Sequence, residues 1–378
     1  MANTLNLGTN GQWATKEGST LAYNDQNGNF KPLPFDFSRA SKATVINKDG
    51  LIEEVGSGEP RIDYKDDSKG ALLLEPSRSN VISYSEDFSN SYWNTNSNTS
   101  RSLSSNLSPE GTANAYRVEA VSGTQVGYVG VTTIGTTITH SVYVRRVSGS
   151  TTFNMVDVNN SATQVDITNE WKRFSVTAVA TSTNLRSYLR LNQVGDVVEI
   201  FGFQAEQGSY PTSYIPTQGS AVTRLQDDFT CNLPDSDSFN SSSGFSVITK
   251  FGIGQANGST SVPFLVFNDD TSATYIGFGS NTTNLRCRLN LSGTSYLNTQ
   301  NAPRTQENSL FVSCDSSGWS QGANGSVGNT GTNNASVFDR LSHITVNVTE
   351  VYGIIKIKEI LIYNTRLTDQ ELIALTQV

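Results

Sequence analysis

Short runs of alternating apolar and polar residues recur along this chain and predict β-strands almost throughout. The clearest run lies in 141–145, where Val142 and Val144 alternate with Ser141, Tyr143 and Arg145. Comparable runs occupy residues 185–191, 245–251, 274–279 and 355–363. One apolar and one polar side per strand is typical of antiparallel sandwiches whose sheets each have a wet face.

A single helical signal stands near the C-terminus. Thr368 and Glu371 form a capping box, in which each side chain bonds the backbone N–H of the other residue. An apolar stretch, 372–375, follows it. We therefore predict an all-β fold of tandem antiparallel β-sandwiches with one short C-terminal helix.

Turn signals and composition shifts divide the chain into five predicted segments. A polar arm, 1–36, precedes a small β region, 37–80, whose Asn47-Lys48-Asp49-Gly50 sequence predicts a hairpin turn with Gly50 at positive φ. The strongest alternation lies in 81–226. An Asp- and Ser-rich stretch, 227–243, is the predicted linker, and 244–378 forms the last domain.

The composition of the chain indicates which kinds of partner it can bind. The chain has 378 residues, a net charge of −8, and no run of Lys and Arg, so we expect it to bind neither nucleic acid nor an anionic membrane. The N-terminal residues lack a basic region and an apolar run, which predicts no signal peptide and a chain made in a cytoplasm. Three widely spaced cysteines give no disulfide framework.

Three segments together resemble a signature of structural proteins of tailed bacteriophages. The first is Gly70-Ala-Leu-Leu-Leu-Glu-Pro-Ser-Arg-Ser-Asn80, running into Tyr84-Ser-Glu-Asp-Phe-Ser-Asn-Ser-Tyr-Trp93. The second is Phe203-Gln-Ala-Glu-Gln-Gly208 with Pro211–Thr217 and Ala221–Arg224, and the third is the upstream lead-in Phe37–Thr44 with Asp49–Ile52. In that family the signature leads into a jelly roll similar to carbohydrate-binding modules, which implies such a domain at 81–226.

The C-terminal segment resembles a second family. Its Lys358-Glu-Ile strand, Tyr363-Asn364 and short Glu-Leu helix are similar to the end of laminin-G/concanavalin-A-like lectin sandwiches. The resemblance implies that 244–378 is a domain of that type. The arm, 1–36, would then attach the protein to a virion.

Catalytic motifs are absent from the sequence. There are two histidines, His140 and His343, and no nucleotide-binding loop or zinc-ligand spacing. Hydrolases of the concanavalin-A-like fold carry a Glu-x-Asp-x-x-Glu strand, and this chain has none. We therefore expect a protein that is not an enzyme, although carboxylates distant in sequence could still form a pair.

Sugar binding requires an aromatic platform and polar side chains that bond hydroxyl groups. Tyr188 is predicted to face the polar side of its strand between Arg186 and Arg190, and Trp319 lies in an Asn/Gly/Ser-rich stretch predicted to be a loop. Tyr92 is a further candidate, although core packing or subunit contact would explain these aromatic residues equally.

Calcium is the one cofactor that the sequence suggests. Glu75, Asp87 and Glu206 lie at the two ends of the jelly-roll segment, where similar sandwiches hold a structural calcium ion. Hydrogen bonding to Arg78 or to backbone amides is the alternative for these carboxylates.

The sequence thus predicts a bacteriophage virion component, such as a head or tail fibre, spike or capsid decoration, with lectin-like domains for host surface polysaccharide. A polysaccharide depolymerase and a purely architectural virion protein are the alternatives. We expect a homotrimer that contacts other virion proteins of the capsid, portal or tail, is located in the virion, and is made in the bacterial host cytoplasm.

Overall fold

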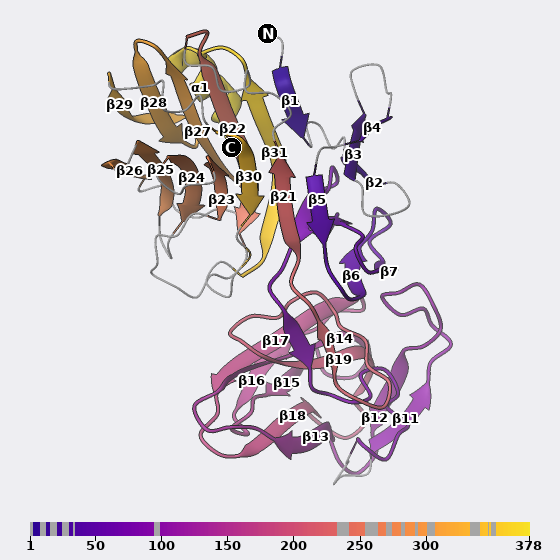
Figure 1. Cartoon of the computed structure of the whole chain (residues 1–378). Helices are drawn as coiled ribbons and strands as arrows, with labels where there is room; N and C mark the ends of the chain where they lie inside the picture. The colour runs from indigo at the N-terminus through magenta and orange to yellow at the C-terminus, as the bar shows by residue number, and fades with distance from the viewer. Residues whose placement is uncertain are drawn as a thin grey trace. The chain divides into compact units, whose positions relative to one another are not determined.

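A computed structural model of the whole chain is shown in Figure 1. The structure describes residues 3–7, 13–15, 21–24, 30–32, 35–93, 99–232, 242–253, 264–269, 274–280, 284–291, 294–300, 307–332, 341–346, 348 and 353–378. The described residues are nearly all in strands and turns, so the predicted all-β class is confirmed.

The chain splits into two compact units. The first contains Met1–Ala40, Val55–Pro76 and Gln226–Val378, and the second contains Ser41–Glu54 and Ser77–Leu225. This division differs from the five consecutive segments predicted above, because both units share the region 37–80. Part of the predicted linker is also a strand, Asp228–Asn232. Local sequence patterns could not reveal this strand, because it pairs with β5 (Phe35–Ser38), which is far away in sequence.

Two large antiparallel sheets and a three-stranded sheet, β2-β3-β4, make the first unit. Its larger sheet has the order β29-β28-β27-β22-β31-β9-β8, with β1 also pairing with β31, and the other large sheet has the order β26-β25-β24-β23-β30-β21-β5. The strands of the larger sheet are β1 (Asn3–Leu7), β8 (Arg61–Asp63), β9 (Ala71–Leu74), β22 (Phe245–Ile253), β27 (Asn308–Asp315), β28 (Gly318–Ala323), β29 (Ser326–Gly331) and β31 (Ile355–Tyr363). The others of this unit are β2 (Trp13–Thr15), β3 (Leu21–Asn24), β4 (Phe30–Pro32), β5, β21 (Asp228–Asn232), β23 (Leu265–Asn268), β24 (Tyr275–Ser280), β25 (Leu285–Leu291), β26 (Thr294–Gln300) and β30 (His343–Val346).

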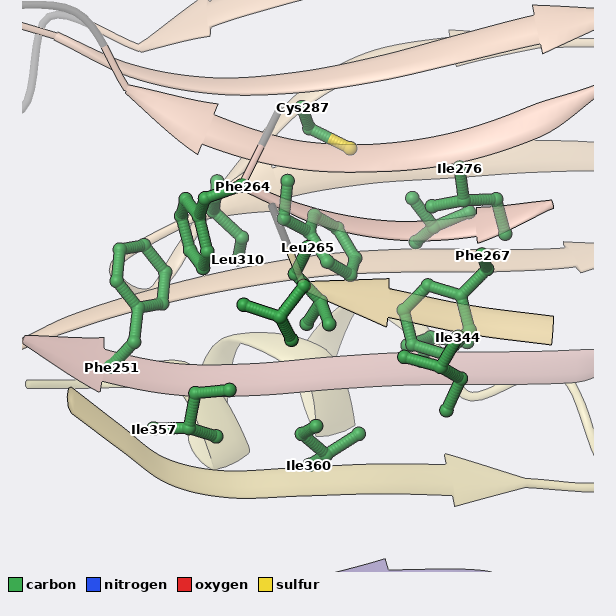
Figure 2. Packing of buried hydrophobic residues seen from close by; sticks show 14 of the residues in the cluster. Phe251, Phe264, Leu265, Phe267, Ile276, Cys287, Leu310, Ile344, Ile357 and Ile360 are labelled. Atoms are coloured by element: carbon green, nitrogen blue, oxygen red, sulfur yellow. The ribbon is translucent and has the colours of Figure 1, made fainter. Parts of the chain in front are cut away.

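Side chains from both sheets form the core of the first unit. Figure 2 shows Phe251, Ile357 and Ile360 from the larger sheet close to residues such as Phe267 and Ile344 from the other. Each of these side chains is fully buried. The sheets therefore form a sandwich, and the hydrophobic faces predicted by the alternation meet in its interior.

Helix α1 (Asp369–Thr376) packs against the same unit. The Thr368 hydroxyl accepts from the Glu371 amide and the Glu371 carboxylate accepts from the Thr368 amide, so the predicted capping box is confirmed. Leu372 of the helix joins a small apolar cluster with Ile248 and Phe311. No helix among the described residues is long and apolar enough to cross a membrane.

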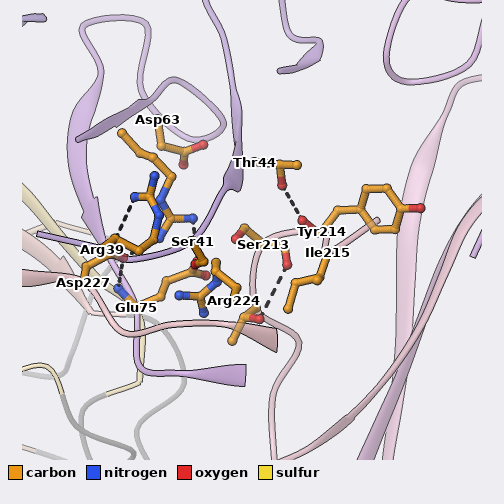
Figure 3. Close-up of polar contacts among 12 residues, drawn as sticks. Arg39, Ser41, Thr44, Asp63, Glu75, Ser213, Tyr214, Ile215, Arg224 and Asp227 are labelled. Carbon is orange, nitrogen blue, oxygen red and sulfur yellow. Dashed lines mark hydrogen bonds and ion pairs between the residues drawn. The ribbon is translucent and has the colours of Figure 1, made fainter. Parts of the chain in front are cut away.

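A buried ion network lies in the first unit where its three chain segments meet. The Arg39 guanidinium lies 3.0 Å from the Asp227 carboxylate, and Arg61 bonds both Asp227 and Glu75, with all four side chains almost fully buried. Figure 3 shows Arg39, Glu75 and Asp227 of this network. Burial alone would lower the pKa of Arg61, but Asp227 and Glu75 outweigh that effect and raise it. Arg61 therefore keeps its charge, and the network joins segments distant in sequence.

The second unit is a smaller sandwich. One sheet has the order β11-β12-β19-β14-β17 and the other β13-β18-β15-β16, while β10 pairs with β20 and β6 with β7. The strands are β6 (Ala43–Ile46), β7 (Ile52–Val55), β10 (Arg78–Asn80), β11 (Thr99–Leu103), β12 (Tyr116–Ala120), β13 (Gln125–Val131), β14 (Thr137–Ser148), β15 (Thr152–Val156), β16 (Ala162–Asp166), β17 (Lys172–Val179), β18 (Asn184–Leu191), β19 (Val197–Gln207) and β20 (Val222–Arg224).

The core of the second unit includes Trp93, which is 1% exposed, with Phe153 and Phe203. The β6–β7 hairpin belongs to this unit: Thr44 donates to the Tyr214 carbonyl, a contact visible in Figure 3. Gly50 has a φ of 78° and its amide donates to the Asn47 carbonyl, so the predicted hairpin turn is confirmed.

Candidate functional site

The second unit contains a hollow of about 420 Å³ at its surface. Glu86, Asp87, Leu103, Asn114, Tyr116, Pro216, Thr217 and Gln218 line it. We call this hollow the groove. Its lining comes from three separate stretches of the chain, one before β11, one around β11 and β12, and one after β19.

Strand pairing and short polar bonds build the groove. Leu103 at the end of β11 pairs with Tyr116 at the start of β12, so the two side chains stand together at one side. On the other side the Ser85 amide donates to the Thr217 carbonyl, and the Thr217 amide donates to the Ser85 hydroxyl. Tyr84 forms a bridge with Gln218. Hydrogen bonds of Ser85 and Thr217 therefore fix this side of the groove.

The two carboxylates of the groove have opposite electrostatic environments. Burial and the nearby Glu110 carboxylate raise the pKa of Glu86, although the Tyr214 hydroxyl donates to it at 2.9 Å. The Ser89 hydroxyl and the Tyr116 hydroxyl both donate to Asp87 Oδ1 and lower the pKa of Asp87. At neutral pH Asp87 is thus fixed as an anion, whereas Glu86 gains a proton more readily than an ordinary glutamate.

The remaining lining groups combine apolar and amide surface. Leu103 is 61% exposed, and the half-buried Tyr116 ring packs edge-on to Phe88 with centroids 5.7 Å apart. The Asn114 side-chain amide donates to Glu110 at 3.1 Å, and Gln218 is exposed. An apolar wall beside amides and carboxylates suits a ligand that has both a hydrophobic face and many hydroxyl groups.

The predicted sugar platform at Tyr188 is a buried residue. Arg186, Tyr188 and Arg190 do share one face of β18, as the alternation predicted. However, Tyr188 is only 8% exposed, and a Cβ on Gly127 of the paired β13 would lie 1.8 Å from its ring. The ring therefore occupies the space beside Gly127, and the expectation of an exposed platform there was wrong. Both arginines are partly exposed, and Arg190 donates to Gln125.

Trp319 also lies in a different environment from the one predicted. It belongs to β28, is 3% exposed and forms part of the first unit's core. The sequence around it contains Gly, Ser and Gln, yet every residue of β28 is buried. The loop prediction for this stretch was wrong, because a strand covered on both faces need not be apolar in composition.

Tyr92 is half-buried and contributes to the second unit's aromatic core. Its ring stacks on Tyr128 with centroids 4.2 Å apart and an interplanar angle of 11°. Its hydroxyl accepts a hydrogen bond from the Ser83 amide, and burial raises its pKa. The ring face is therefore occupied by another tyrosine, and Tyr92 does not line the groove.

The three carboxylates proposed for calcium have protein partners instead. Glu75, in the first unit, pairs with Arg61 at 2.8 Å, while Asp87 and Glu206 belong to the second unit. Glu206 is fully buried, accepts from the Thr212 amide and hydroxyl, and has a pKa raised by burial. Among the described residues no group of three or more His, Cys, Asp or Glu side chains is placed to hold a metal ion. The calcium prediction thus finds no support in these residues.

Several solved structures resemble parts of this chain, although no protein-family model and no curated protein matches it. A CBM40 of the Ruminococcus gnavus IT-sialidase, solved with α2,3-sialyllactose, is 17% identical with a TM-score of 0.30, covering 36% of this chain and 84% of that one. Domain 4 of a GH43 extracellular arabinanase from Geobacillus stearothermophilus, in complex with arabinotriose, is 22% identical with a TM-score of 0.32, covering 45% and 83%.

The receptor binding domain of botulinum neurotoxin C/D mosaic serotype is also similar. It is 11% identical with a TM-score of 0.32, and the match covers 40% of each chain. At such identities and TM-scores the likeness assigns no ligand to this chain. A function must therefore be inferred from the groove and the sequence.

Proposed function

We propose that this chain is a glycan-binding structural component of a bacteriophage virion and that it binds sugar in the groove of its second unit. The observation that carries the proposal is the lining itself. Leu103 and the Tyr116 ring offer an apolar wall, while Asn114, Gln218 and the two carboxylates offer hydrogen-bonding groups to hydroxyls. This combination is what recognition of a sugar ring requires.

The groove is a shallow site, and its depth sets the expected affinity. Few apolar side chains line it, and most of its polar groups must lose water before they bond a sugar. We expect weak binding at each single site. A homotrimer would raise the apparent affinity for a repeating surface polysaccharide through multivalency. Light scattering at micromolar concentration should find the trimer, and a monomer would contradict this part of the proposal.

The virion assignment is supported by the sequence alone. The Gly70–Asn80 and Tyr84–Trp93 stretches and the Phe203–Arg224 region resemble the phage signature, in the order found in that family. Other virion proteins would be its partners. Particles purified from infected cells and probed with an antibody against this chain should contain it, and its absence from particles would leave only the glycan-binding part.

Binding can be tested with variants that spare the fold. We suggest Gln218→Ala and Leu103→Ser, since both side chains are exposed in the groove, with Gln164→Ala as control because it is an exposed amide of β16 in the same unit. Isothermal titration with oligosaccharides from host surface polysaccharide should show about fivefold weaker binding for each groove variant, the loss typical of one hydrogen bond or apolar contact. Equal binding by all variants, or no binding by the parent protein, would refute the groove as the site.

A depolymerase is the second candidate, and one observation favours it. Glu86 and Asp87 line the same groove with pKa values displaced in opposite directions, which is the property that an acid/base pair needs. Incubation with host polysaccharide should release no reducing ends if the protein only binds. Release that stops in Glu86→Gln would move the protein to the hydrolases.

A further inference from the structure

Negative charge gathers at the groove. Glu86 and Asp87 line it, and Glu110 lies close enough to raise the pKa of Glu86. No lysine or arginine is among the described residues that line it. Arg101 lies within electrostatic range of Asp87, but its guanidinium donates to the carbonyls of Phe88 and Trp93, at 2.6 and 3.2 Å. A ligand in the groove therefore meets two carboxylates beside the neutral amides of Asn114 and Gln218.

We propose that the groove selects glycans that carry an unsubstituted amino sugar, whose ammonium group is held by the Asp87 and Glu86 carboxylates. This inference rests on the proposed glycan-binding function and adds the class of sugar. The same lining disfavours glycans that carry carboxylates, such as uronic or sialic acids, because like charges would approach each other in a half-buried site.

The geometry of the lining supports this selection. An ammonium group has three donors and no acceptor, which complements a site of carboxylate and amide oxygens. The Tyr116 hydroxyl donates to Asp87 at 3.1 Å, so the ring that would contact the sugar also orients the carboxylate. Leu103, next to Tyr116 on the paired strand, extends the apolar wall. The sugar ring and its charged substituent can thus be held by neighbouring groups.

The ionisation of Glu86 gives the selection a pH dependence. Two groups influence the pKa of Glu86: the Tyr214 hydroxyl, which donates a hydrogen bond to it, and the Glu110 carboxylate, which repels its charge. Glu110 itself accepts a hydrogen bond from Asn114, and the charge of Glu54 raises the pKa of Glu110. As pH falls through the raised pKa of Glu86, its charge is lost and ammonium binding weakens. At high pH the amine of the sugar loses its proton, so binding should be strongest between these limits.

Two tetrasaccharides that differ only in acetylation provide the test. Titration of the whole protein near pH 6.5 at low salt should show a glucosamine tetrasaccharide binding about fivefold or more tightly than its fully N-acetylated form, the size expected for one partly buried ion pair. A tetragalacturonate should bind more weakly than either. High salt should narrow the difference, because exposed charges are screened.

Matched variants separate charge from shape. Asp87→Asn and Glu86→Gln keep size and hydrogen-bonding capacity, and each should reduce the preference for the free amine without altering circular dichroism. Asp166→Asn serves as control, since Asp166 is an exposed carboxylate of β16 outside the groove. Equal or tighter binding of the acetylated or acidic sugar would overturn the selection while leaving glycan binding intact. Failure to bind any of the three sugars and any host polysaccharide would instead overturn the proposed function.

Discussion

His140 should make the second unit less stable in mild acid. This residue lies in β14, is 1% exposed, and its Nδ1 lies 3.4 Å from the Val156 carbonyl oxygen. Its Nε2 is buried and bonds no described residue. Burial lowers the pKa of His140 to about 4. The folded unit therefore binds a proton at this histidine only at a lower pH than the unfolded chain does.

The size of the effect is set by the two pKa values. The pKa of an ordinary histidine is 6.5, and the folded unit lowers the pKa of His140 to about 4. Each pH unit between these two values corresponds to about 1.36 kcal/mol, so the full loss in free energy of unfolding is about 3 kcal/mol. Between these values the unfolded chain binds more protons than the folded one, so the free energy of unfolding falls as pH falls. Near pH 5 the loss relative to neutral pH should be about 2 kcal/mol, and below pH 4 it should level off at about 3 kcal/mol.

The variant His140→Asn isolates this contribution. Asparagine can still donate to the Val156 carbonyl but cannot take up a proton. Buried Glu206 has a raised pKa, which makes the folded unit more stable relative to the unfolded chain as pH falls, so wild type alone would report a mixture. The difference between wild type and variant removes that background.

Pulsed hydrogen exchange across a urea series measures the second unit by itself. Peptides from β14 and β19 report its unfolding, independently of the first unit. The wild-type midpoint should fall between pH 7.5 and pH 5 by more than that of His140→Asn. The same pH dependence in both proteins, or a wild type that is more stable near pH 5, would refute the reasoning.

Three further predictions concern packing and charge. Asp227→Asn should destabilise the first unit by about 3–5 kcal/mol, because the buried Arg39 and Arg61 each lose an anionic partner. Peptides from β22 and β31 in the same urea experiment should show the loss, and the exposed control Asp36→Asn should leave them unchanged. Trp319→Ala should cost about 3–5 kcal/mol as a core truncation, measured by the same peptides, whereas a glycan platform in a loop would leave stability unaltered. Gly127→Ala should lower the melting temperature, because the added Cβ would clash with the Tyr188 ring. Such overpacking costs about 1–3 kcal/mol of stability. An unchanged melting temperature would show that the ring can move at no cost.

Local patterns were sufficient to predict strands with clear alternation, such as β14, β18 and β22, as well as the β6–β7 turn and the capped helix. Each depends on residues close in sequence: Gly50 supplies the positive φ, and Thr368 and Glu371 cap one turn. The pairing partners could not be predicted in the same way. Strand β21 lies beside β5 and β30 because the core closes there, and the linker-like composition around it gave no sign of this.

The residues that line the groove also could not be identified from local sequence patterns alone. Asp87 was selected from the sequence, but as a calcium ligand, and Tyr116, Asn114 and Gln218 were not selected. They come together because β11 pairs with β12 and because Ser85 bonds Thr217, contacts that no single stretch encodes. Glu86 stood inside the phage-like signature, which was the only local signal at this position.

The route of the chain has a consequence for inheritance. Glu75 and Asp227 exchange backbone and side-chain hydrogen bonds, so residues 77–225 leave and re-enter the first unit at adjacent points. A gene rearrangement could replace that stretch as a cassette and leave the ends of the host sandwich in place. The hairpin 41–54, however, packs on the replaced unit and is encoded upstream. Recombination that exchanges the second unit must therefore transfer two separate stretches of coding sequence, those for 41–54 and 77–225. If only the longer stretch is exchanged, the hairpin loses the unit on which it packs.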